Sequence, residues 1–263
     1  MIPLTSENYY SKEADLAYFS ASQIKAFKKC EACAMAELTG QYERPMSQAL
    51  YQGQFVDEAL TGDYAEWALK NASVISKRDG NLKSEFMLCQ EMVARAKRDD
   101  LFMDYVKGDH QAIFCGKLFG VPFKAKLDVI TNERIVDLKT VRDLSPVYLP
   151  GQGRVDFATA WDWPLQMAIY QRLVEELTGK HLPCYLAVIT KETPPDIRIV
   201  QIEQERMDAE MAWLEQVLPR YEAIKSGAID PERCEACAWC RQSRVLMGPE
   251  LLGDMEEGGA IHE

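Results

Sequence analysis

Apolar residues recur every three or four positions over several stretches of the chain, and this period is typical of amphipathic helices. The first such stretch predicts a helix over 20–38, which Ser20 or Ser22 can cap and which Gly40 ends. Residues 1–18 show no such period and are predicted to be irregular. Further helices are predicted over 46–60, 83–98, 157–178 and 203–225, with a short helix and a loop in 62–82.

Elsewhere apolar and polar residues alternate, and a period of two is typical of strands. Strands are predicted over 111–118, 121–130, 134–139, 182–190 and 196–202. The Pro- and Gly-containing loop 142–157 is expected to frame a cleft or to move. Because helices precede, interrupt and follow these strands, the predicted fold class is α/β, with a mixed central sheet flanked by helices.

The composition is that of an ordinary soluble globular protein, with 263 residues, 47% apolar and 27% charged. No run of about 18 apolar residues is present, so no membrane span is predicted. The first residues have neither the basic nor the apolar segment of a secretory signal. A cytoplasmic protein, in a bacterial or phage-infected cell, is therefore expected.

The net charge of −11 argues against a chain coated in basic patches, although a local basic surface can still bind nucleic acid. Acidic residues concentrate in 202–215 and in the tail 254–263. Basic residues gather in two groups, which are Lys25, Lys28 and Lys29, and then Lys124, Lys126, Lys139 and Arg142.

Two of the predicted strands form a hairpin that carries acidic residues. If Asn132 and Glu133 are the central turn residues, Asp128 pairs directly with Asp137. Opposed residues lie roughly 4.5–5.5 Å apart, and two like charges there are destabilising unless something neutralises them. A divalent metal is the economical answer, because Mg²⁺ is commonly held by one or two carboxylates.

Lys139 lies two residues after Asp137 and therefore projects from the same face of its strand. A cation there can stabilise developing negative charge or orient a water molecule. The plainer interpretation is that these charged residues form a solvated edge of the sheet.

Cysteines near both ends suggest a second site. Cys234, Cys237 and Cys240 follow the C-x₂-C-x₂-C spacing that supplies three ligands to one [4Fe–4S] cluster, and Cys30 is the candidate fourth ligand. A competing interpretation is a Zn²⁺ site made by Cys30, Cys33, Cys234 and Cys237. The other three cysteines, Cys89, Cys115 and Cys184, lie in apolar surroundings and are predicted core residues.

A third group is Gln166 and Tyr170, one helical turn apart on one face of a predicted helix. An amide and a phenol there could hold a phosphate or a water molecule. The alternative is an ordinary core-edge aromatic beside an exposed amide.

Together these residues resemble the PD-(D/E)XK nuclease superfamily, and most closely its RecB-like and RecE-like phage exonuclease branch. The matching motifs are Asp128, then Asp137-Leu-Lys139, then Gln166-x-x-x-Tyr170, in that order. The opening Ser20-Ala-Ser22 with Cys30 is also similar to the lead-in of iron–sulfur RecB-type nucleases. The match covers about residues 19–245. One departure is Asp57, which stands where many relatives have a histidine.

The resemblance implies a restriction-endonuclease-like core and a metal-dependent DNA exonuclease. Mg²⁺ or Mn²⁺ would be held by Asp57, Asp128, Asp137 and the Leu138 carbonyl, with Lys139, Gln166 and Tyr170 completing the catalytic set. The resemblance also implies a [4Fe–4S] cluster on Cys30, Cys234, Cys237 and Cys240, with Zn²⁺ as the alternative. Lys124, Lys126 and Arg142 are expected to contact DNA phosphates without reading sequence.

The resemblance further implies digestion from 5′ to 3′, a ring-shaped homo-oligomer and a single-strand annealing protein as partner. One domain over 1–263 is expected, with its core in about 46–225 and the cysteine-bearing segments 19–38 and 226–245 joined to each other. Two other functions are possible. They are an inactive DNA-binding or regulatory protein on a nuclease fold, and an adaptor held together by Zn²⁺.

Overall fold

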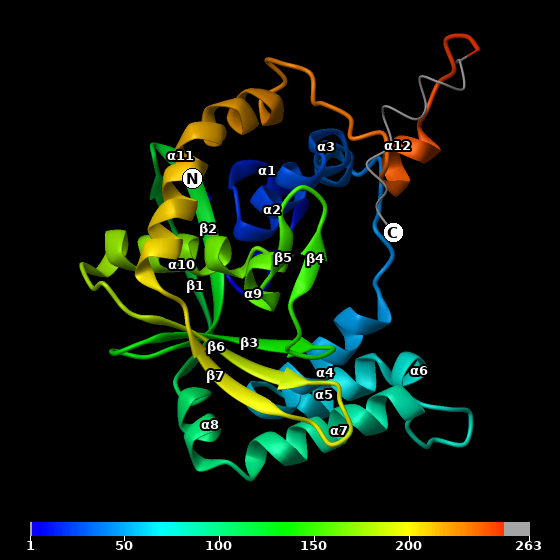
Figure 1. Cartoon of the computed structure of the whole chain (residues 1–263), viewed down its shortest axis with the longest axis vertical. Helices are drawn as coiled ribbons and strands as arrows, with labels where there is room; N and C mark the ends of the chain where they lie inside the picture. The colour runs from blue at the N-terminus through cyan, green and yellow to red at the C-terminus, as the bar shows by residue number, and fades with distance from the viewer. Residues whose placement is uncertain (1, 250–263) are drawn as a thin grey trace.

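A five-stranded mixed sheet forms the centre of the computed structural model, which describes residues 2–249 (Figure 1). The strand order is β1-β2-β3-β6-β7, in which β3 and β6 are parallel and all other neighbours are antiparallel. The strands are β1 (Asp109–Leu118), β2 (Val121–Ile130), β3 (Ile135–Val141), β6 (Cys184–Thr190) and β7 (Ile197–Gln201). The predicted α/β class with a mixed sheet is confirmed.

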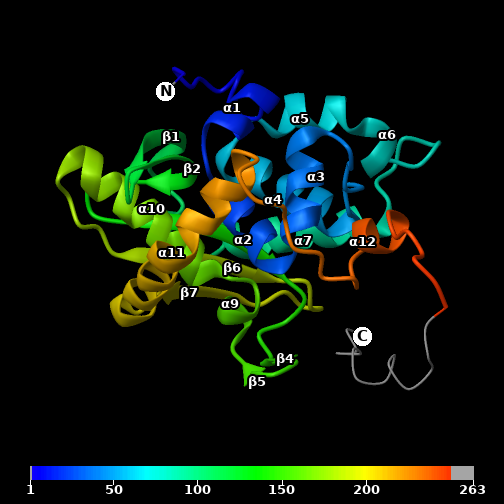
Figure 2. The ribbon, with the colours of Figure 1, turned by 90° about the horizontal axis from the view of Figure 1, so that it is seen from above.

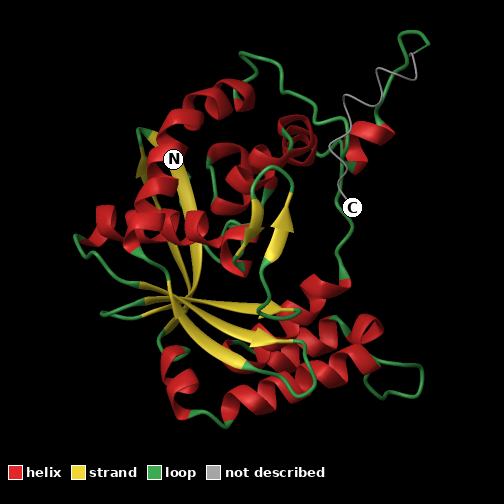
Figure 3. Cartoon of the chain, in the orientation of Figure 1, coloured by secondary structure: helices red, strands yellow, loops and turns green. Residues whose placement is uncertain are grey.

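Helices cover both faces of this sheet (Figure 3). One layer contains α2 (Ala21–Lys29), α10 (Trp163–Thr178) and α11 (Gln204–Lys225). The opposite layer contains α4 (Gln48–Thr61), α7 (Ser84–Lys97) and α8 (Asp100–Tyr105). Each layer encloses a separate apolar core against the sheet, and burial of each large side chain there contributes about 1.5–3 kcal/mol.

The remaining elements are short. They are α1 (Lys12–Ala17), α3 (Glu31–Thr39), α5 (Tyr64–Lys70), α6 (Ala72–Ile75), α9 (Phe157–Ala160), α12 (Ala238–Gln242) and the two-stranded β4 (Val147–Leu149) and β5 (Gly153–Val155). Figure 2 shows β4 and β5 extending beyond α9. Among the short elements, α1, α8, α12, β4 and β5 were not predicted, since each is too short to show a clear period.

The helix predicted over 20–38 is wrong as a single element, because the chain breaks at Cys30. Cys30 has an extended backbone, with φ −167° and ψ 110°, and its Sγ accepts a hydrogen bond from the Cys33 amide at 3.4 Å. Ser20 caps α2, and Gly40 ends α3 with φ 77°. The break gives Cys30 the role of an N-cap, which serine, threonine and asparagine usually take.

The helix predicted over 157–178 is also divided, into α9 and α10. The break falls at Asp162, which has a left-handed backbone with φ 52°, and Pro164 then starts α10. Segment 62–82 holds two short helices where one was predicted. No helix within residues 2–249 has the length and apolar content to cross a membrane. The acidic tail 254–263 lies outside the described residues.

Candidate active site

The β2–β3 hairpin has the predicted register. Val129 pairs with Val136 and Ile130 with Ile135, so Asn132 and Glu133 are the central turn residues and Asp128 lies opposite Asp137. The Asp128 carboxylate accepts a hydrogen bond from the Leu138 amide at 3.0 Å. The two aspartates are therefore brought together on neighbouring strands.

Lys139 reaches back to Asp137, and its ammonium contacts Asp137 Oδ2. Burial lowers the pKa of Lys139, but the charges of Asp137 and Asp128 outweigh burial and leave the pKa raised above its ordinary value. Burial, followed by the charge of Asp137, raises the pKa of Asp128 well above its ordinary value. The centre therefore concentrates negative charge around one lysine.

Asp57 joins the centre from α4. Gln111 of β1 lies between the carboxylates, and its Nε2 donates to Asp57 Oδ2 at 3.3 Å and to Asp128 Oδ1 at 3.5 Å. Thr61 also donates to Asp57, at 2.9 Å. Burial is the largest cause of the raised pKa of Asp57, and the charge of Asp137 adds to it.

Gln111 belongs to the site. From the sequence, it was expected only to lie near the β2–β3 hairpin, without a role of its own. Its φ is 54°, in the left-handed region that residues other than glycine rarely adopt. Such strained residues cluster at functional sites. A sequence signal did exist, because Phe119 and Gly120 form a two-residue turn and that register sets Gln111 opposite Asp128.

Gln166 and Tyr170 line the other side of Asp137, as their shared helix face predicted. Gln166 Nε2 donates to Asp137 Oδ1 at 2.8 Å and lies 3.1 Å from the Tyr170 hydroxyl. Gln166 Oε1 accepts from Lys25 Nζ at 2.7 Å. Lys25 therefore also belongs to the site, although the sequence indicated only that it lies in a basic cluster.

The three expected phosphate contacts differ in their surroundings. Lys124 is 1% exposed and forms an ion pair with Asp15 at 2.7 Å, so its ammonium is not offered to solvent. Lys126 Nζ lies 5.2 Å from the ring of the exposed Tyr10. Arg142 is 90% exposed and pairs with Asp143 at 2.7 Å.

The acidic residues have the chemistry that a hard divalent cation prefers, because carboxylate and carbonyl oxygens suit Mg²⁺ and Mn²⁺. Asp137 Oδ2 is buried, and the Lys139 ammonium is its one partner among the described residues. A carboxylate oxygen with one partner keeps a second lone pair that a metal ion can use. Residues Asp57, Asp128 and Asp137 therefore fit a divalent metal.

The cysteines form the second predicted group. Within residues 2–249, the sulfur atoms of Cys30, Cys234, Cys237 and Cys240 all lie within 4.8 Å of one another, a spacing that fits a shared metal centre. Backbone amides donate to three of the four sulfurs at 3.3–3.4 Å. Such hydrogen bonds favour thiolates, the form that binds metal.

Cys33 packs in the same buried cluster, but its sulfur is not one of the four that lie within 4.8 Å of one another. Its Sγ faces Glu37 at 3.8 Å. Burial raises the pKa of the Cys33 thiol to about 12, as it does for Cys240, so the positions of the sulfur atoms distinguish the two sets. The ligand set predicted for a cluster is therefore gathered, whereas the alternative set with Cys33 is not.

A salt bridge fixes the cysteine group to the helical layers. Glu31, next to Cys30, accepts two hydrogen bonds of 2.7 Å from Arg220 of α11 and one of 2.8 Å from the Glu232 amide. In Figures 1 and 2, α12 lies beside α3. The two cysteine-bearing segments are thus held against each other through polar contacts as well as sulfur.

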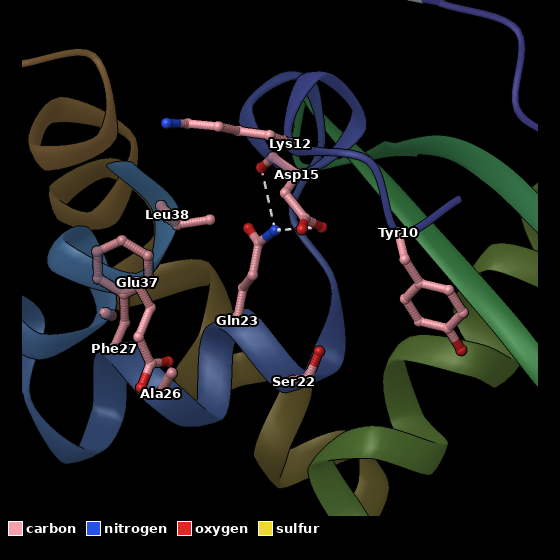
Figure 4. A pocket seen from close by; sticks show the side chains of 10 residues that line it. Tyr10, Lys12, Asp15, Ser22, Gln23, Ala26, Phe27, Glu37 and Leu38 are labelled. Carbon is pink, nitrogen blue, oxygen red and sulfur yellow. Dashed lines mark hydrogen bonds between the residues drawn. The ribbon is translucent and has the colours of Figure 1, made fainter. Parts of the chain in front are cut away.

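A separate cavity of about 370 Å³ lies among α1, α2 and α3. Figure 4 shows Gln23 donating to the backbone and the carboxylate of Asp15, at 3.0 and 3.4 Å. None of the predicted site residues lines this cavity, so it has no part in the candidate centre.

Comparison with known proteins agrees with this geometry. Residues 20–243 match the family described as "PDDEXK-like domain of unknown function (DUF3799)". A solved structure titled "Putative exonuclease", from Eubacterium rectale, is 36% identical with a TM-score of 0.93, and the match covers 97% of this chain and 98% of that chain. The search of curated proteins gave no match.

The chain therefore belongs to the PDDEXK-like family, and its fold is a nuclease fold. The resemblance noted from Asp128, Asp137, Lys139, Gln166 and Tyr170 is confirmed at the level of this superfamily.

Proposed function

We propose that this chain is a metal-dependent DNA exonuclease. The observation that carries the proposal is the convergence of Asp57, Asp128, Asp137 and Lys139 in one buried centre on a PDDEXK-like fold. The name of the structural relative supports the same reaction.

Asp57, Asp128, Asp137 and the Leu138 carbonyl would hold Mg²⁺ or Mn²⁺. A bound divalent metal polarises a phosphate and lowers the pKa of a coordinated water. Burial, and then the charge of Asp137, raises the pKa values of Asp57 and Asp128, and a bound cation would favour their ionised forms.

Lys139 supplies positive charge beside the scissile phosphate. Despite burial, the charges of Asp137 and Asp128 raise the pKa of Lys139 in the metal-free protein and favour its ammonium form, which would stabilise negative charge in the transition state. Gln166 and Tyr170 support Asp137 from α10. The 2.8 Å hydrogen bond from Gln166 fixes the orientation of Asp137, and Tyr170 steadies the Gln166 amide.

Lys126 and Arg142 are the proposed phosphate contacts, and Lys124 is omitted because it is buried in its ion pair with Asp15. Backbone contacts of this kind position DNA without reading its sequence. Digestion from 5′ to 3′, a ring-shaped oligomer and an annealing partner stay predictions from the resemblance.

The test uses linear duplex DNA and covalently closed circular DNA, each with Mg²⁺ or Mn²⁺. The wild-type protein should degrade only the linear form. Asp137→Ala should lose activity by about a hundredfold or more, because metal stabilisation is worth several kcal/mol. Asp109→Ala, an exposed aspartate of β1, is the matched control and should keep wild-type activity. Full activity of folded Asp137→Ala would refute the proposal.

A catalytically inactive DNA-binding protein is the second candidate. It predicts that linear DNA is bound without any metal-dependent cleavage. The intact set of Asp128, Asp137 and Lys139 in one centre favours the enzyme.

For the four-cysteine group we propose a structural metal centre. The resemblance favours [4Fe–4S], while two sulfur separations, 3.6 Å for Cys30–Cys240 and 3.9 Å for Cys234–Cys240, match the roughly 3.8 Å of one tetrahedral ion with Zn–S bonds of about 2.3 Å. Metal analysis with a visible spectrum distinguishes the two. A brown protein containing iron has the cluster, and a colourless protein containing zinc has the single ion.

A further inference from the structure

A cavity of about 640 Å³ adjoins the candidate centre, and the nuclease motifs do not account for it. Its volume falls in the range of pockets that hold small organic ligands, a class that includes a nucleotide. Residues from α2, α4, the end of β3, the β4 region and the α9–α10 junction line it. It lies next to the β4–β5 hairpin, which Figure 2 shows extending beyond α9.

The cavity shares part of its wall with the catalytic centre. Lys25 lines it and also donates to Gln166, which contacts Asp137. Trp163 lines it too, and the Lys139 ammonium lies 5.6 Å from the centre of the Trp163 ring. A ligand that fills the cavity therefore ends beside the reacting groups.

Positive charge is concentrated in this wall. Four basic side chains line the cavity, against one carboxylate, that of Asp143. They are Lys29 and Arg142, together with Lys25 and Lys191, whose pKa values burial lowers, that of Lys25 to about 7. In a chain with a net charge of −11, such a concentration marks a place for an anionic ligand.

Aromatic rings accompany the cations. Trp161 is 55% exposed, whereas Phe157 and Trp163 pack edge to face behind it with ring centres 5.9 Å apart. The backbone after Trp161 is anchored, since Asp162 forms an ion pair with Lys28 at 2.6 Å. The exposed Trp161 ring offers a stacking surface for a base.

We propose that this cavity binds unpaired nucleotides of a DNA strand, with a base stacked on Trp161 and phosphates beside Arg142 and the lysines. Aromatic platforms in basic grooves are how proteins hold single strands without reading sequence. A base inside a duplex is stacked on both faces and leaves none for Trp161, so the site favours unpaired nucleotides. The inference rests on the proposed nuclease function, because it places a strand end next to Asp137.

The test is binding of a fluorescently labelled oligothymidine to the full chain, measured by anisotropy in EDTA so that no cleavage occurs. Trp161→Ala should weaken binding about five- to 150-fold, the equivalent of one stacked base. Trp161→Phe should retain most of the affinity. Phe119→Ala, an exposed aromatic on the β1–β2 turn, is the matched control and should bind as wild type.

The charge is tested separately. Arg142→Ala should reduce the slope of log affinity against log salt by about 0.7, the value for one phosphate contact on a single strand. Lys97→Ala, an exposed lysine of α7, should leave the slope unchanged. Circular dichroism confirms that each variant is folded.

Two results would overturn the proposal. One is oligothymidine affinity in folded Trp161→Ala within twofold of wild type. The other is an equal loss of affinity for a relaxed, covalently closed circular duplex, which has neither ends nor unpaired nucleotides. A failure of the proposed nuclease function would give a different result. Linear DNA would stay intact with Mg²⁺ and Mn²⁺, while oligothymidine binding would still depend on Trp161.

Discussion

The catalytic residues are held by hydrogen bonds that leave little choice of orientation. Lys25 Nζ contacts Gln166 Oε1 at 2.7 Å, an arrangement that leaves Gln166 Nε2 to donate to Asp137. The Gln166 amide of α10 is therefore oriented by a residue of α2, a neighbouring helix in the same layer. The carboxylates, in contrast, have more charge than the surrounding donors can satisfy.

Replacing Lys25 tests the orientation of Gln166. Lys25→Met keeps the length of the side chain and removes the donor, so the amide can turn and Asp137 loses a fixed partner. A hydrogen bond to a charged group is worth about 1.5–3 kcal/mol, so kcat should fall about tenfold or more. Steady-state digestion of linear DNA measures it, with Lys97→Met as control. A kcat equal to that of wild type would show that Gln166 is oriented by other contacts.

Asp128 gives a prediction that depends on pH. Burial and then Asp137 raise its pKa in the folded state, so its ionised form is disfavoured and it lowers the stability of the metal-free protein as pH rises above about 4. Asp128→Asn removes this penalty and keeps an acceptor for the Leu138 amide. In EDTA at pH 8 the variant should melt about 2–4 °C higher for each kcal/mol removed.

The difference between Asp128→Asn and wild type should shrink as the pH falls towards about 4, where the unfolded carboxyl also takes up its proton. Added Mg²⁺ should stabilise the wild type and not the variant. Thermal melts of both proteins, with Asp109→Asn as control, measure these effects. A variant that melts below wild type at pH 8 would contradict the account.

The sequence predicted the residues of the catalytic centre better than it predicted the residues that hydrogen-bond to them. Asp128 opposite Asp137 followed from the turn at Asn132 and Glu133, which is a local feature. Lys25 and Gln166 are 141 positions apart, and no local pattern reports such a contact. The strained φ of Gln111 was equally invisible, because it depends on packing.

At the scale of elements, single residues interrupt patterns that otherwise continue. The helical period runs through Cys30 and through Asp162, yet both positions break a helix. At Cys30 the thiol caps α3 and joins the cysteine group, and at Asp162 the carboxylate pairs with Lys28. Tertiary contacts outweigh the local period at both places, so sequence alone predicted longer helices.

The start of β1 depends on one glycine. Gly108 has φ 153°, and a Cβ there would lie 2.6 Å from the Ile130 carbonyl oxygen. Gly108→Ala should therefore force β1 away from β2 and lower the free energy of unfolding by about 2–3 kcal/mol. Because β1 carries Gln111 to Asp128, activity should fall as well. Denaturant unfolding and DNA digestion measure the two effects.

Gly80→Ala is the matched control for Gly108→Ala. Gly80 also has positive φ, at 83°, but no atom lies within 4 Å of the added Cβ. Its cost should be only the left-handed backbone penalty of about 1–2 kcal/mol, with activity unchanged. Equal losses of stability in the two variants would show that the Ile130 contact has no effect.

At the scale of the molecule, the cysteine group and the catalytic centre share α2. This helix carries Lys25 to Gln166 and ends at Cys30, five residues later. The same region is fixed to α11 through Glu31 and Arg220. Metal bound by the cysteines should therefore stabilise the layer that orients Gln166, although the two sites use different residues.

Cys240→Ser tests this coupling. Cys240 is fully buried within the four-sulfur group, so its loss should release the metal, lower the melting temperature and reduce DNA digestion several-fold through the looser α2. Cys89→Ser, an equally buried thiol in the opposite layer, should retain the metal and its activity. The coupling is tested by measuring metal content, thermal melts and digestion rates on the same preparations. If Cys240→Ser loses its metal but digests DNA at the wild-type rate, the cysteine centre stabilises the terminal segments without supporting catalysis.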